Sequence, residues 1–130
     1  MDAKLKHEIE DAVSQMMTKF LKEQMGEQAE MVDTHIVGET IIVRFKGVLS
    51  PAERHMVNGQ EGMKLIKALK ERLIERATPL LVAIIKDLTK AEGVDVHSSF
   101  DAKIGERMVI FTLDKNLEKS ALMYEHAASW

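Results

Sequence analysis

The chain has 130 residues, about one domain, of which 45% are hydrophobic and 30% charged, so a wholly disordered chain is excluded. A net charge of −3 gives no reason to expect a nucleic-acid partner. The absence of cysteine excludes disulfides, zinc–thiolate sites and cysteine nucleophiles, and it is compatible with a reducing cytoplasm. The longest apolar run, 80–85, is far shorter than the roughly 20 residues that span a bilayer. We therefore expect one cytoplasmic domain over 1–130, without a secretory signal or direct membrane insertion.

The first half of the chain predicts a helix followed by a hairpin. Apolar residues recur at helical spacing over 5–25, with Asp2 placed to cap the helix and Gly26 placed to end it. Two strands are expected at 31–37 and 40–48, where β-branched and aromatic residues alternate with polar ones.

A capping box, Ser50-Pro51-Ala52-Glu53, predicts a short helix that Asn58-Gly59 interrupts. A longer helix is expected over about 61–91, because its apolar positions stay in phase across Pro79, which should only kink it. Such a helix would be roughly 45 Å long. A compact chain of this size has a radius of gyration near 14 Å, so the helix would protrude unless a second subunit covered it. This mismatch favours a homodimer.

The second half of the chain repeats the order of the first. Strands are expected at 94–100 and 106–113, after which Asp114 is a candidate cap for a short C-terminal helix ending near Ala128. The two strand pairs share Val-Asp-x-His followed by Gly-Glu, which suggests duplicated α-β-β units over about 3–48 and 61–113, with 114–130 as an extension. The predicted fold is α+β, with an antiparallel or mixed four-stranded sheet and the long helix packed on one face.

The repeat also places two candidate pairs of metal ligands. Asp33 and His35 share one strand face, as do Asp95 and His97, because side chains at i and i+2 point the same way. Two pairs related by a pseudo-twofold axis could form a site of two histidines and two carboxylates. The alternative, which we favour, is that all four are polar positions on the solvent face of the sheet.

The long helix carries basic residues that could contact an anion or a partner. Arg72 and Arg76 lie one turn apart, with Lys64, Lys67 and Lys70 upstream. Acidic residues are interleaved with them, so a solvated face of mixed charge is the favoured alternative.

Several short blocks resemble the bacterial DUF2294 family, also called MpsC-like after a sodium-translocating, membrane-potential-generating system. The resemblance spans about residues 3–113 and rests on 48–53, Arg72-Leu73, Ile84-Ile85 and 108–113. Members tend to have a Gly-rich, Pro-containing element after the first helix, where this chain has 26–30. The resemblance implies no catalytic residues; it implies Arg72 alone as a ligand or partner contact.

Three functions remain open. The first is a non-catalytic accessory or regulatory homodimer without a cofactor, cytoplasmic or peripheral to the inner face of the membrane. Its unidentified protein partner would be a transport complex, as the family name implies. The second is a small-molecule or metal-binding sensor that uses the two Asp/His pairs or a cavity between sheet and helices. An enzyme is the least favoured, because no catalytic spacing is present, although scattered residues can form acid–base sites.

Overall fold

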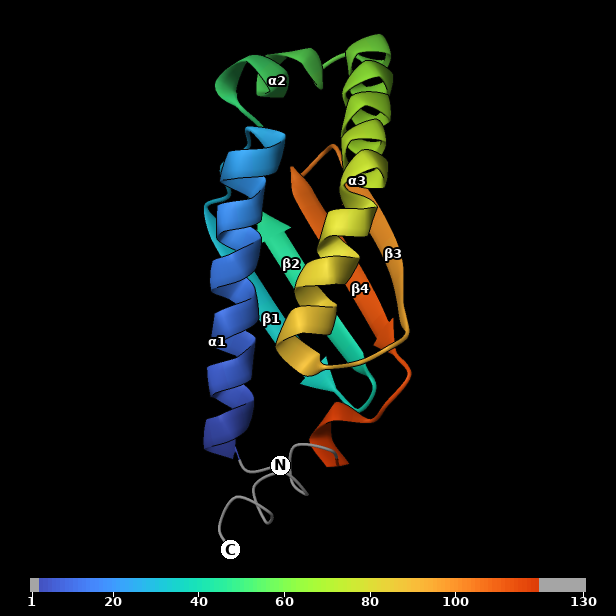
Figure 1. The fold of residues 1–130 in the computed structure, drawn as a ribbon. Coiled ribbons are helices and arrows are strands. Elements are labelled where there is room, and N and C mark those ends of the chain that lie inside the picture. The colour runs from blue at the N-terminus through green and yellow to red at the C-terminus, as the bar shows by residue number, and fades with distance from the viewer. Residues whose placement is uncertain (1–2, 120–130) are drawn as a thin grey trace, which may run out of the picture.

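The computed structural model describes residues 3–119 and shows the predicted α+β fold (Figure 1). The elements in chain order are α1 (Ala3–Phe20), the π-helical turn η1 (Leu21–Met25), β1 (Met31–Val37), β2 (Thr40–Lys46), α2 (Pro51–Met56), α3 (Gln60–Thr89), β3 (Val94–Asp101) and β4 (Glu106–Leu113). Every helix and strand expected within 3–113 is present.

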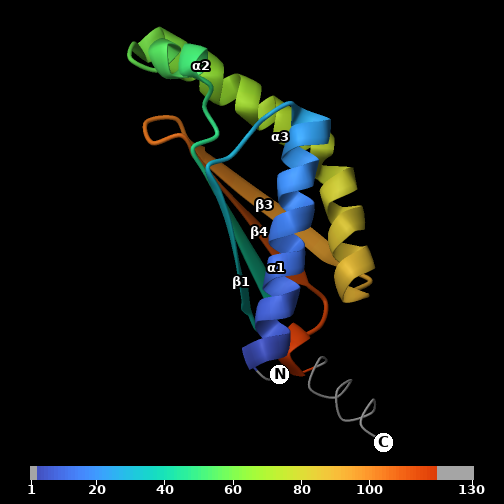
Figure 2. The ribbon, with the colours of Figure 1, turned by 90° about the vertical axis from the view of Figure 1, so that its left-hand side faces the viewer.

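The sheet has the order β1-β2-β4-β3, and all neighbouring strands are antiparallel. Both α1 and α3 lie on the same side of it, so no helix of residues 3–119 covers the other face (Figure 2). The central strands β2 and β4 supply the most apolar inward faces, which explains why they take the centre. Their buried inward residues are Ile41, Val43, Phe45, Val109, Phe111 and Leu113. The repeat stays a prediction, although this order is one that a duplicated hairpin can produce.

The helix α1 packs on β1 through apolar and polar contacts. Val13 and Met17 are fully buried against the sheet. The buried carboxylate of Glu10 accepts a hydrogen bond of 2.9 Å from the backbone N–H of Ile36 on the edge strand. The predicted stop at Gly26 is confirmed, since this glycine adopts the left-handed conformation at φ 63° after the π turn. The predicted cap Asp2 lies outside the described residues.

The capping box before α2 forms as expected. The hydroxyl oxygen of Ser50 accepts from the N–H of Glu53, and the Glu53 carboxylate accepts from the N–H of Ser50. The interruption that follows is also confirmed, with Gly59 as the first residue before α3. The next turn is close-packed, because a Cβ at Gly62 would lie 1.9 Å from the carbonyl oxygen of Met56.

The long helix α3 runs through Pro79 without interruption, as predicted. Its two halves point in different directions, and the half that follows Gln60 extends past the end of the sheet together with α2 (Figures 1 and 2). Proline removes one backbone hydrogen bond and crowds the preceding turn, which accounts for a bend at this position. The helix therefore has a half packed on β3 and a half that projects.

The C-terminal helix begins at Leu117 and differs from the prediction in its cap. Asn116, not Asp114, has the capping geometry, because its side-chain oxygen accepts from the N–H of Lys119 at 3.2 Å. Asp114 instead accepts from the N–H of Gly93 at 2.8 Å, which ties the end of β4 to the start of β3. The expected end of this helix lies outside the described residues.

Candidate functional site

The two Asp/His pairs lie on the uncovered face of the sheet, at its opposite edges. Asp33 and His35 are partly exposed on β1, and their side chains approach each other to 3.9 Å. Asp95 and His97 are exposed on β3. The register aligns His35 with His97 across the sheet, but β2 and β4 lie between them.

This strand order corrects the hypothesis of a shared metal site. Three strand spacings separate β1 from β3, which is roughly 14 Å. Metal ligands lie near 2.0–2.2 Å from the ion, so the four side chains cannot converge on one metal. Residues 3–119 contain no group of three or more histidine or carboxylate side chains placed to hold a metal ion. The polar-face alternative agrees with the exposure of both histidines.

The candidate contact residues Arg72 and Arg76 are exposed on α3. Within residues 3–119 neither guanidinium has a hydrogen bond or ion pair. Both lie beside an exposed row of leucines, because Arg72 is three residues after Leu69 and Arg76 is four residues before Leu80. The structure thus leaves both side chains available for a contact outside the subunit.

This row, which we call the leucine stripe, consists of Leu65, Leu69, Leu80 and Leu88, with exposed fractions between 36% and 58%. The sequence places many apolar residues of α3 in phase, but the face that packs inward is a neighbouring one. Its buried members are Ile66, Lys70, Ile74, Leu81, Ile85 and Thr89. The stripe is therefore apolar surface that the subunit itself does not bury.

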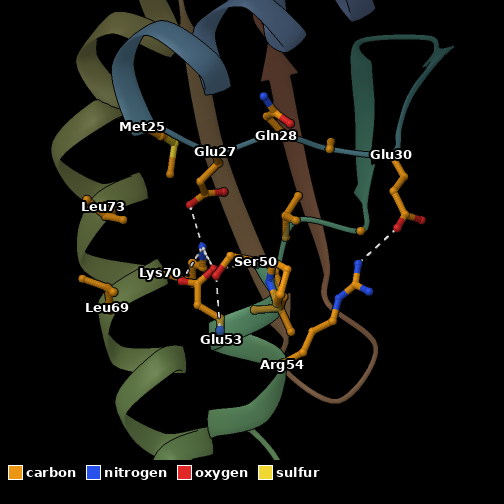
Figure 3. A pocket seen from close by; sticks show the side chains of 16 residues that line it. Met25, Glu27, Gln28, Glu30, Ser50, Glu53, Arg54, Leu69, Lys70 and Leu73 are labelled. Atoms are coloured by element: carbon orange, nitrogen blue, oxygen red, sulfur yellow. Dashed lines mark hydrogen bonds and ion pairs between the residues drawn. The ribbon is translucent and has the colours of Figure 1, made fainter.

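A cavity of about 880 Å³ lies where α3 leaves the sheet (Figure 3). Two connections form its walls, 26–30 after η1 and 47–50 after β2. They face the start of α2 and the middle of α3. Gly47 has a φ of 66° and approaches the Glu30 side chain so closely that a Cβ would lie 2.5 Å from it. At this wall of the cavity, a side chain in place of Gly47 would collide with Glu30.

A buried cluster of charges lies at the inner end of this cavity. The Lys70 side chain is 2% exposed, and its Nζ lies 3.1 Å from Glu27 Oε1 and 3.1 Å from Glu53 Oε2. Glu27 and Lys70 approach each other from opposite walls (Figure 3). The guanidinium of Arg107, 1% exposed, lies behind Glu27 at 3.8 Å and donates to the backbone oxygen of Lys70 at 3.3 Å. The cluster joins α2, α3, β4 and the 26–30 connection.

The cluster influences two pKa values. Burial tends to raise the pKa of Glu53, but hydrogen bonds from Ser50 and the ammonium of Lys70 outweigh it and hold that pKa below its ordinary value. Burial lowers the pKa of Arg107, and Glu27 and Glu71 oppose this effect. Arginine nevertheless stays charged at neutral pH. The buried groups therefore include at least one cation that cannot be neutralised.

Neither Glu27 nor Arg107 was predicted as a site residue, and the favoured interpretation of Lys70 was a position on a solvated face of mixed charge. For two of these residues, the periodicity of the sequence does indicate burial. Lys70 lies four residues from both Ile66 and Ile74, which places it on the buried face of α3. Arg107 shares the strand alternation of Val109, so it faces inward. Glu27 follows a helix end, where no periodicity indicates its direction.

Comparison with known proteins relates the chain to a family and to a protein of Bacillus subtilis. A family model described as "Na+-translocating membrane potential-generating system (MpsC)" matches residues 5–115. The chain is 34% identical over 117 residues to the protein named "Uncharacterized protein YbcI" of Bacillus subtilis (strain 168), an alignment that covers 90% of this chain and 94% of that relative. No solved structure matches. Among residues 3–119 no helix has both the length and the apolar character needed to cross a membrane.

Proposed function

The chain belongs to the MpsC family, and from this premise we propose that it is an accessory protein of a membrane ion-transport system. In this proposal the protein acts as a homodimer in the cytoplasm, at the inner face of the membrane, and regulates or docks onto the transport complex through protein contacts. The family description supports the link to ion transport. The leucine stripe of α3 is the single structural observation that carries the dimer.

The position of the stripe supports pairing with a second copy of this chain. The helix has 30 residues and is thus about 45 Å long, and one of its halves projects beyond the sheet. Leu65 and Leu69 lie on that projecting half, whereas Leu80 and Leu88 lie beyond the bend. A twofold axis across the middle of α3 would pair the two halves with each other and bury all four leucines in an isologous contact.

The arginines beside the stripe indicate that this face of α3 contacts a protein and is not simply exposed to solvent. Arg72 and Arg76 are exposed beside the stripe and have no partner in the described part of the chain. Arginine is enriched at protein interfaces, where its fork can pair with carboxylates. In the proposed dimer these two residues contact the second subunit or the transport complex next to it.

Replacement of stripe residues by charge tests the dimer. In the variant Leu65→Glu/Leu80→Glu, four carboxylates per dimer would enter an apolar contact, so the dimer dissociation constant should rise at least about tenfold. The matched control is Ile104→Glu, which changes an apolar side chain outside α3 that is more exposed than either leucine. Sedimentation equilibrium on the full chain gives the dimer dissociation constants of the wild type, the double variant and Ile104→Glu. A wild-type protein that stays monomeric, or a double variant that dimerises like the wild type, would contradict the proposal.

The transport role is tested separately in cells. We expect deletion of the gene to lower the sodium-dependent membrane potential, measured with a voltage-sensitive dye. The wild type and Ile104→Glu should restore it, whereas Leu65→Glu/Leu80→Glu should not. An unchanged potential after deletion would reject the link to ion transport and leave the dimer to be judged by sedimentation alone.

A further inference from the structure

We propose that the open face of the sheet is the surface that docks onto the transport complex, and that it receives a basic amphipathic helix of a membrane protein. The open face consists of the outward side chains of β1, β2, β4 and β3, which no helix of residues 3–119 covers (Figure 2). This inference deepens the proposed function and rests on it for the identity of the partner. The chemistry of the surface does not depend on the dimer formed by α3.

The centre of the open face is apolar. Ile42 on β2 and Met108 and Ile110 on β4 are partly exposed there, and the register places Ile42 directly opposite Ile110. Within residues 3–119 these three side chains are not among those that form the buried core or pack against it. An antiparallel sheet with one solvated face usually has polar residues on that face, so the two central strands depart from this pattern. A partner that covered the three side chains would remove apolar surface from water.

Both edges of the open face are acidic. Asp33 lies on the edge strand β1, and Asp95 and Asp101 lie on the other edge strand, β3. In the described part of the chain, none of the three carboxylates pairs with a lysine or an arginine; Asp33 has only His35 beside it, at 3.9 Å. The central strands add little net charge, because Arg44 pairs with Glu106 and leaves Lys46 as the single further cation of the face.

These charges select among the possible partners. In an aligned packing with a second copy, a twofold axis would bring β1 onto β1 or onto β3, so acidic edges would face acidic edges. An anionic lipid surface or a nucleic acid would meet the same unpaired carboxylates. A protein segment with lysine or arginine on both sides of an apolar stripe matches the pattern instead, since its cations would pair with the two edges.

The dimensions of the open face fit a single α-helix. The edge strands lie three strand spacings apart, about 14 Å, and a helix with its side chains is about 10 Å across. A helix along β2 and β4 would cover Ile42 and Ile110 while its flanks reach Asp33 on one side and Asp95 on the other. The central strands have seven and eight residues, about 25 Å, which corresponds to four or five helical turns.

Membrane transport proteins offer segments of this kind. Lysine and arginine are concentrated in their short cytoplasmic loops and next to the ends of their membrane spans. A basic amphipathic helix at the inner face of the membrane would therefore carry the cations that the acidic edges lack, together with an apolar side for the centre of the open face.

Two peptides test this chemistry. Both form amphipathic helices of about four turns with leucine on the apolar side, and their flanks carry lysine in one peptide and glutamate in the other. Calorimetric titration of the full chain should show saturable binding of the lysine peptide, at least about tenfold tighter than the glutamate peptide. Asp33→Asn/Asp95→Asn should weaken binding of the lysine peptide about fivefold. The matched control Asp11→Asn/Asp87→Asn removes the same charge from α1 and α3 and should change it less than about twofold.

Amide NMR spectra of the wild-type protein locate the bound peptide without any variant. The lysine peptide should shift the signals of Ile42 and Ile110 and leave that of the exposed Lys67 on α3 unchanged. Equal or tighter binding of the glutamate peptide, shifts confined to the helices, equal effects of the two double variants, or no saturable binding would each overturn the proposal. Failure of the proposed function is a different result, an unchanged membrane potential after deletion of the gene, which the peptide titration neither requires nor predicts.

Discussion

The buried ammonium of Lys70 offers a quantitative test of the cluster. Replacement by methionine keeps an unbranched side chain of similar size but removes the charge, so Glu27 would remain buried with only Arg107 nearby at 3.8 Å. At 3.1 Å each ion pair of Lys70 has a gross Coulomb energy of about 5 kcal/mol at an effective dielectric constant of 20. Desolvation of the ammonium offsets much of this energy. Removal of one member of a buried pair typically costs about 3–5 kcal/mol.

We therefore expect Lys70→Met to lower the free energy of unfolding by about 3 kcal/mol. In urea this loss shifts the midpoint by roughly 2 M, for a typical slope of about 1.5 kcal/mol per M. Circular dichroism follows the transition. The exposed Lys67→Met is the control and should stay within about 0.5 kcal/mol of the wild type. The double variant Lys70→Met/Glu27→Gln should recover part of the loss, since it removes the unpaired charge. A Lys70→Met protein within about 1 kcal/mol of the wild type would refute the structural importance of the cluster.

Three further predictions concern α2 and its surroundings. Gly62→Ala should lower the melting temperature, because its Cβ would meet the Met56 carbonyl oxygen at 1.9 Å, whereas Gly59→Ala, with open space around its Cβ, should have a smaller effect. Equal melting temperatures would disprove this close packing. Ser50→Ala removes the acceptor of a capping bond and should cost about 1 kcal/mol, or about 4 °C in melting temperature; an unchanged value would contradict the role of the cap. Because the folded-state pKa of Glu53 lies below its ordinary value of 4.5, its carboxylate stabilises the fold at neutral pH, and this contribution is lost as the pH falls through the folded-state pKa. The unfolding free energies of the wild type and Glu53→Gln should converge as the pH is lowered from 4.5. A difference that widens instead would show that folding raises the pKa of Glu53.

Local features of the fold were predictable because they depend on neighbours in the sequence. The capping box at Ser50 and the stop at Gly26 follow from short-range hydrogen bonding, and they appear where expected. The path of α3 through Pro79 was also predictable, because the apolar phase is the same on both sides of the proline.

Long-range relations were not predictable in the same way. Two α-β-β units can form one sheet with either the first or the second strand of each pair at its centre. The spacing of residues in the sequence could therefore not show that His35 and His97 lie at opposite edges of the sheet. The first half of α3 is joined through Lys70 to an ion cluster that includes Glu27, a residue in a connection without periodicity. The sequence therefore showed that the residues of the leucine stripe are apolar, but only the structure shows that they are exposed.

The central claim, that α3 forms the contact between two subunits, is most directly tested by disulfide cross-linking. The chain has no cysteine, so single substitutions report without background. Leu65, Leu69, Leu80 and Leu88 would each be replaced by cysteine in turn, with the exposed Val37→Cys on β1 as the control. After mild oxidation in dilute solution, we predict that the stripe position nearest the twofold axis forms covalent dimers fastest and that Val37→Cys does not. Cross-linking of no stripe position faster than Val37→Cys would contradict the account.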